Sequence, residues 1–63
     1  MFAVRYPHQR VAYTYNWKEY VTFDKAVEVG RDAIRGRYSW FEVYNVDFIN
    51  GKKIYKLFVR VYN

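Results

Sequence analysis

Hydrophobic and polar positions alternate with the period of a β-strand over most of this 63-residue chain. Residues 2 to 6 alternate, and Pro7 then interrupts the pattern because proline has no backbone N–H to donate. A second alternating run extends from residue 10 to residue 23, with a bend or interruption around residues 16 to 18. The first third of the chain therefore predicts two strands joined by a turn.

One segment departs from this alternation and has helical spacing. Its small and aliphatic positions fall on one helical face, at Ala26, Val27, Gly30, Ala33 and Ile34. Thr22 or Asp24 can cap the start, and Gly36 suits the left-handed residue that ends a helix. The small inward residues indicate a helix that lies close to a sheet.

Residues 39 to 49 and 52 to 62 alternate on both sides of Asn50-Gly51, the strongest short-range signal for a hairpin. The predicted order is strand, strand, helix, strand, strand. We therefore expect a single α+β domain over residues 1 to 63, with a four-stranded antiparallel sheet and one helix packed on one face (ββαββ).

Two registers of this last hairpin are open. A two-residue turn pairs residues whose numbers sum to 101 and places Glu42 on the same face as Val59. A three-residue loop with a bulge at Gly51 pairs numbers that sum to 100, and we prefer it because it keeps that carboxylate out of the core. The preferred register predicts that Trp40 lies beside Arg60, where the two form a cation–π pair, and that Tyr44 lies beside Lys56.

In either register, the face away from the helix carries aromatic side chains interleaved with bases. A single helix shelters one side of the sheet, so this second face is expected to stay open. The predicted partner-binding residues on it are Trp40, Tyr44, Lys56, Phe58, Arg60 and Tyr62, with Tyr15 and Trp17 as extensions.

Charge and composition narrow the class of protein. Eleven Lys and Arg against six Asp and Glu give a net charge of +5, which favours nucleic acid or an acidic protein surface as partner. The chain has no cysteine, so disulfides and thiol chemistry are excluded and a cytoplasmic location is expected. No apolar stretch is long enough for a membrane span or a signal peptide.

Catalytic chemistry has little support in the sequence. His8 is the only histidine, and we interpret it as a solvated residue of a turn rather than a general base. The six carboxylates are dispersed, and the glycines form no phosphate-binding loop. We therefore expect no enzymatic activity, no cofactor and no metal.

The segments TFDKAVEVGRDAI (22 to 34) and WFEVYNV (40 to 46) resemble small bacteriophage host-takeover proteins. That family also combines strands with a Thr-led helix bearing inward alanines and a Phe-Glu-Val strand. The resemblance covers about half of the chain, which adds a fourth strand and a basic charge. It implies a compact, non-catalytic protein that occupies a surface on a larger machine.

Two functional hypotheses follow from these observations. The first is a small regulator or inhibitor that docks on a larger protein or a nucleic-acid-handling complex, in a phage-type host-interaction or anti-defence role. The alternative is direct binding of single-stranded nucleic acid by the basic and aromatic face. Pairing of two copies into a homodimer is a third use of the same face.

Overall fold

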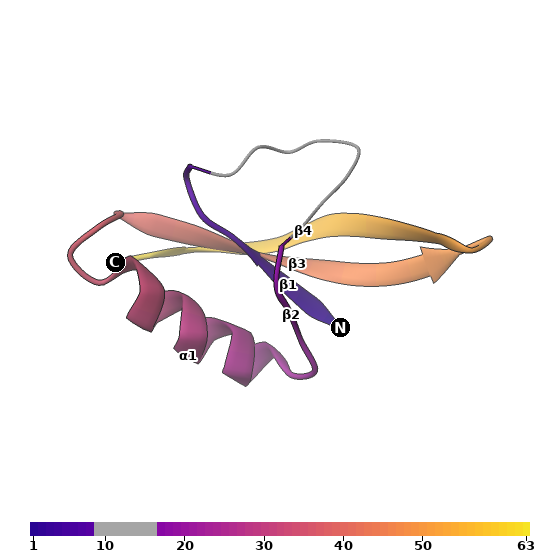
Figure 1. The fold of residues 1–63 in the computed structure, drawn as a ribbon, viewed down its shortest axis with the longest axis horizontal. Helices are drawn as coiled ribbons and strands as arrows, with labels where there is room; N and C mark the ends of the chain where they lie inside the picture. The colour runs from indigo at the N-terminus through magenta and orange to yellow at the C-terminus, as the bar shows by residue number, and fades with distance from the viewer. Residues whose placement is uncertain (9–16) are drawn as a thin grey trace.

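The computed structural model describes residues 1–8 and 17–63, and the elements follow the predicted order of strand, strand, helix, strand, strand (Figure 1). Their bounds are β1 Phe2–Arg5, β2 Glu19–Tyr20, α1 Phe23–Ile34, β3 Trp40–Ile49 and β4 Lys52–Tyr62. The strands form one antiparallel sheet in the order β2-β1-β3-β4. The α+β fold expected from the sequence is therefore confirmed, with β1 and β3 in the centre and β4 along one edge.

The second predicted strand is much shorter in the described part of the chain. Residues 10–16 of that prediction lie outside the described residues, and β2 comprises Glu19–Tyr20. Its predicted end at residue 23 is wrong, because Phe23 is the first residue of α1. Thr22 Oγ1 accepts a hydrogen bond from the backbone N of Lys25 at 3.2 Å, and this N-cap favours the helix over a continued strand.

The start and end of α1 agree with the sequence. Thr22 caps the first turn, and Gly36 has a positive φ of 70° just beyond the last turn. Gly30 faces the ring of Phe41 so closely that a Cβ atom there would lie 2.3 Å from a ring carbon. A glycine at this position therefore allows the close approach of helix and sheet. Ala33, expected on the inner face, is exposed.

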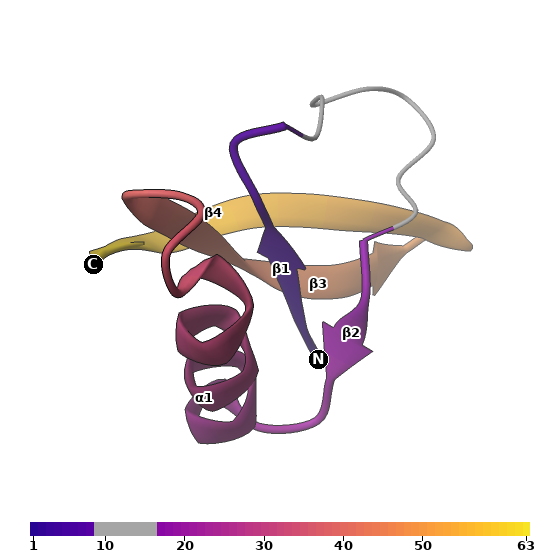
Figure 2. The same ribbon diagram turned by 60° about the vertical axis from the view of Figure 1, so that its left-hand side comes forward.

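The main hydrophobic core lies between α1 and the sheet. Its buried members are Val4, Ala26, Ile34, Phe41 and Val43. The helix packs mainly against β1, β2 and β3 and leaves much of β4 uncovered (Figure 2). This limited coverage is expected, because a helix about 10 Å wide spans only two or three strands that are about 4.8 Å apart.

A second hydrophobic cluster lies on the face of the sheet away from α1. Ala3, Trp17, Tyr44 and Val46 are buried there, and Tyr55 packs against them. The centroid of the Trp17 ring lies 4.8 Å from that of Tyr44 and 5.3 Å from that of Tyr55. The expectation that this face is open is therefore wrong at its centre, because Trp17 returns across the sheet and covers it.

The β3–β4 hairpin combines two registers. Ile49 pairs with Lys52 across a two-residue Asn50-Gly51 turn, in which both turn residues have positive φ, so the preferred three-residue loop is wrong. A bulge beside Val43/Tyr44 then shifts the pairing by one residue, and Val43 lies opposite Val59. Phe58 is the additional residue on β4.

The turn end of this hairpin projects beyond the other elements (Figure 1). Phe48 and Ile49 near the turn are exposed. Among the described residues, no helix has the length and apolar character needed to cross a bilayer.

Candidate functional site

The centre of the face away from α1 is a buried carboxylate surrounded by donors. Glu42 is 3% exposed. Its Oε1 accepts hydrogen bonds from Arg5 Nη1 at 2.6 Å and from the Tyr44 hydroxyl at 3.0 Å. Its Oε2 accepts from Arg60 Nε at 3.2 Å and Arg60 Nη2 at 2.8 Å. Three strands, β1, β3 and β4, are therefore joined by one side chain.

The ring of Trp40 lies beside both guanidinium groups. The Cζ atom of Arg60 is 4.0 Å from the ring centroid, and that of Arg5 is 5.5 Å away. The predicted cation–π pair between Trp40 and Arg60 is confirmed. The arrangement holds both arginines against the sheet.

These contacts set the charge state of Glu42. Burial by itself raises the pKa of this carboxyl, but hydrogen bonds from Arg60, Tyr44 and Arg5 outweigh burial, and the pKa lies below its usual value. The carboxylate is therefore ionised at neutral pH. It takes up donors of both arginines, which leaves less of this face available to an external anion.

Two predicted partner-binding residues are buried within the protein. Trp17 is 6% exposed and Tyr44 is 9% exposed. Both belong to the second hydrophobic cluster, so neither presents a surface to a partner. Tyr15 lies outside the described residues.

The bulge changes the positions of Phe58 and Lys56. Phe58 points toward the helix side, where its ring centroid lies 5.2 Å from that of Phe23 and 6.1 Å from that of Phe2. Lys56 lies opposite Asn45, on the face that Tyr44 does not share. The expected grouping of Lys56 and Phe58 with Arg60 on one face is therefore wrong.

Exposed apolar side chains instead occur on both faces of β4. Leu57 and Tyr62 lie on the face away from the helix and are 54% and 64% exposed, and Phe58 on the helix side is 55% exposed. We call these three residues the β4 patch. Sequence reasoning missed Leu57 because it placed this residue beside Val43 on the core face, whereas the bulge places it opposite Tyr44 on the face away from α1.

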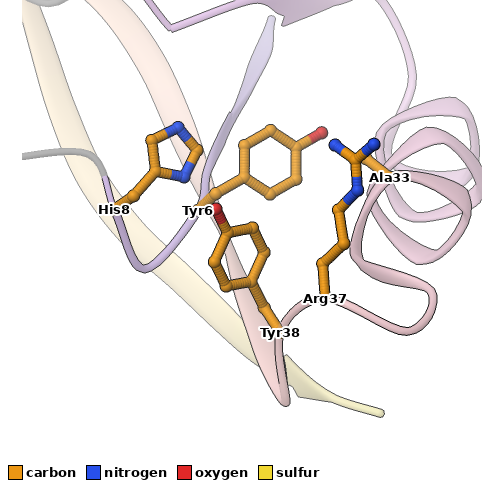
Figure 3. A pocket seen from close by; sticks show the side chains of 5 residues that line it. All are labelled: Tyr6, His8, Ala33, Arg37 and Tyr38. Atoms are coloured by element: carbon orange, nitrogen blue, oxygen red, sulfur yellow. The ribbon is translucent and has the colours of Figure 1, made fainter.

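A separate pocket lies between the end of β1 and the end of α1 (Figure 3). Its volume is about 110 Å³, and its lining residues are Tyr6, His8, Ala33, Arg37 and Tyr38. The ring planes of Tyr6 and His8 differ by 3°, and those of His8 and Tyr38 by 22°. His8 is exposed, as expected, yet it stacks with two tyrosines.

The described residues contain no group of three or more His, Asp or Glu side chains that is suited to a metal ion. The described surface offers apolar contact along β4, and stacking and hydrogen bonding in the pocket.

Comparison with protein-family models, curated proteins and solved structures finds no match.

Proposed function

We propose that this chain is a small, non-catalytic, cytoplasmic binding protein that docks on an acidic surface of a larger protein through β4 and thereby regulates or inhibits it. The observation that carries the proposal is the β4 patch, whose three large side chains are each more than half exposed. Exposed Tyr, Phe and Leu side chains on one element supply the apolar contact area that protein interfaces use. The phage-type layout of the sequence supports the same class of function.

The backbone of β4 also favours docking. This strand has 11 residues and lies at the end of the strand order, so in the described part of the chain only β3 pairs with it. An edge strand presents N–H and C=O groups to which an extended segment of a partner adds. The β4 patch would then contact side chains on both sides of the added strand.

The charge of β4 supports an acidic partner. The strand contains Lys52, Lys53, Lys56 and Arg60 and no carboxylate. Lys53 pairs with Glu19 at 2.6 Å and Arg60 pairs with Glu42, whereas Lys52 and Lys56 form no ion pair within residues 1–8 and 17–63. Two lysines therefore remain for carboxylates of the partner.

The same geometry argues against the alternative, in which the aromatic face binds single-stranded nucleic acid. Such binding needs free cations beside free rings. On this face Arg5 and Arg60 donate to Glu42, while Trp17 and Tyr44 are buried. The exposed residues of the β4 patch are apolar or phenolic, which suits a protein partner.

Site-specific photocrosslinking tests the proposal. A photoreactive phenylalanine analogue replaces Leu57 or Tyr62 in the chain expressed in its source cell, and the control position is Arg31, which is exposed on α1. We expect both β4 positions, and not position 31, to crosslink to one larger protein. That protein is then purified and its affinity for the native chain is measured.

A charge substitution completes the test. Leu57→Asp should weaken binding to the purified partner by more than about tenfold, since it places an unpaired carboxylate in an apolar contact, and Arg31→Asp should not. Three results would overturn the proposal: crosslinking at position 31 equal to that at 57 and 62, crosslinks only between two copies of this chain, or unchanged affinity of the Leu57→Asp variant.

A further inference from the structure

We propose that the pocket between the ends of β1 and α1 binds a single nucleotide unit, with the planar base stacked on the His8 and Tyr38 rings and the phosphate held by Arg37. No residue of β4 lines this pocket. The inference is therefore independent of docking through the β4 patch.

The rings of the pocket provide a stacking surface. The centroid of the His8 ring lies 5.4 Å from that of Tyr38 and 6.1 Å from that of Tyr6, and the three planes are nearly parallel. Nucleobases stack on aromatic side chains of this kind with little dependence on base identity. The exposure of His8 leaves part of this surface accessible from solvent.

Arg37 supplies the charge. Its side chain forms no ion pair or hydrogen bond within the described residues, and Figure 3 shows it extending along the pocket toward Tyr6. The lining residues include no carboxylate. An unpaired guanidinium beside aromatic rings is suited to a phosphate group.

The neighbouring groups are compatible with an anion. Burial, together with nearby Tyr20, raises the pKa of Tyr6, so its hydroxyl stays neutral and adds no negative charge to the pocket. The backbone N–H groups of Arg37 and Tyr38 both donate to the carbonyl of Ile34, at 2.9 and 3.1 Å. These two bonds satisfy one of the carbonyls at the C-terminal end of α1, and the guanidinium of Arg37 lies near the same negative end of the helix dipole, where a cation is favoured.

The size of the pocket limits the ligand. About 110 Å³ is smaller than the ~300–1,000 Å³ typical of sites that enclose drug-sized molecules. One ring system with its phosphate at the mouth therefore fits better than an extended chain. The nucleotide is either free in solution or the terminal unit of a strand, and both offer the same base and phosphate.

Nuclear magnetic resonance titration of the ¹⁵N-labelled chain tests the proposal. Adenosine 5′-monophosphate is the main probe, with adenosine, inorganic phosphate and a 5′-phosphorylated oligonucleotide as separate arms. We expect the monophosphate to shift the amide signals of residues 6, 8, 33, 37 and 38 and to bind more tightly than adenosine or phosphate alone. Tighter binding of the oligonucleotide would identify a strand terminus as the source, and equal binding a free nucleotide.

Arg37→Gln is the decisive variant and Arg31→Gln its control, because both remove one charge from an exposed arginine near the end of α1. We expect Arg37→Gln to weaken binding of the monophosphate at least about tenfold, the loss expected for a charge-assisted hydrogen bond. Arg31→Gln should leave it within about twofold. The amide spectrum of each variant reports whether the fold is intact.

The proposal is overturned if millimolar monophosphate shifts no signal of the pocket, or if Arg37→Gln and Arg31→Gln bind equally. Strong shifts on β4 with none at the pocket would also overturn it. A failure of this kind leaves docking through Leu57 and Tyr62 untouched, because the crosslinking experiment reads different residues.

Discussion

Glu42 occupies the hydrogen-bond donors of several side chains on the face of the sheet away from α1. A carboxylate removed from water is costly unless donors replace the lost hydration, and Glu42 receives hydrogen bonds from Arg5, Tyr44 and Arg60. The same bonds hold Arg60, which the sequence predicts as a partner-binding residue, together with Arg5. The residue thus stabilises the sheet and reduces its affinity for external anions.

Substitution of Glu42 tests this structural role. We expect Glu42→Gln to lower the free energy of unfolding at pH 7 by about 2–3 kcal/mol, because Arg5 is left half-buried without its counter-charge. Urea denaturation measures the change. The exposed Glu28→Gln is the matched control and should change the free energy by less than about 0.5 kcal/mol.

Acid should reveal the same charge in the native protein. Because the folded pKa of Glu42 is depressed, its contribution to stability is present above the unfolded pKa of about 4.3 and is lost as the pH falls through the folded pKa. Between these two pKa values, the stability of Glu42→Gln should therefore fall less steeply with acid than that of the native chain. Parallel pH profiles would contradict this account.

At the scale of elements, local signals predicted more than non-local ones. The helix was predictable because the cap at Thr22 and the left-handed Gly36 act within a few residues of its ends, and the Asn50-Gly51 turn is a local signal of the same kind. The position of Trp17 was not predictable, because no local sequence pattern indicates that its ring packs against Tyr44. The second face was consequently predicted to be open where it is closed.

The predicted register of the β3–β4 hairpin is wrong for a related reason. The two-residue turn requires one pairing near Ile49, whereas contact of Glu42 with Arg60 requires a pairing shifted by one residue. Each of the two registers derived from the sequence was uniform along the hairpin. A bulge at Phe58 satisfies both requirements. The contacts that favour this bulge join residues far apart in the sequence, so the local pattern of residues does not predict it.

Deletion of Phe58 should therefore straighten β4 without changing its partners. Removal of one residue from the bulge leaves Val43 opposite Val59 and Tyr44 opposite Leu57 in a continuous ladder. Cross-strand nuclear Overhauser effects between these pairs measure the result. If Arg60 instead loses its contact with Glu42 in the deletion variant, the bulge itself determines how β3 and β4 pair, which would contradict this prediction.

On the scale of the whole molecule, the sheet is covered unevenly. The helix lies mainly over β1, β2 and β3, and Trp17 packs on part of the opposite face. The residues of the β4 patch remain more than half exposed, although Phe58 packs edge-on against Phe23 of α1. Among the predicted partner-binding residues, Phe58 and Tyr62 are therefore exposed in the structure, and Trp17 and Tyr44 serve the fold. Which of these aromatic residues are buried and which are exposed depends on packing between elements, and the alternation of residues along a strand does not predict it.

Two copies of the chain could cover each other along β4, and a measurement of stability separates that arrangement from docking on a larger protein. An obligate dimer becomes more stable as the protein concentration rises, whereas the stability of a monomer is independent of it. We expect the urea midpoint of the native chain to stay constant over an approximately hundredfold range of concentration, because the β4 patch is open in the free protein.

We also expect Leu57→Ser to lower the free energy of unfolding by only about 1 kcal/mol, since half of this side chain is already in water, against about 3 kcal/mol for the fully buried control Val43→Ser. A midpoint that rises with concentration, and that loses this dependence in Leu57→Ser, would assign β4 to a homodimer instead.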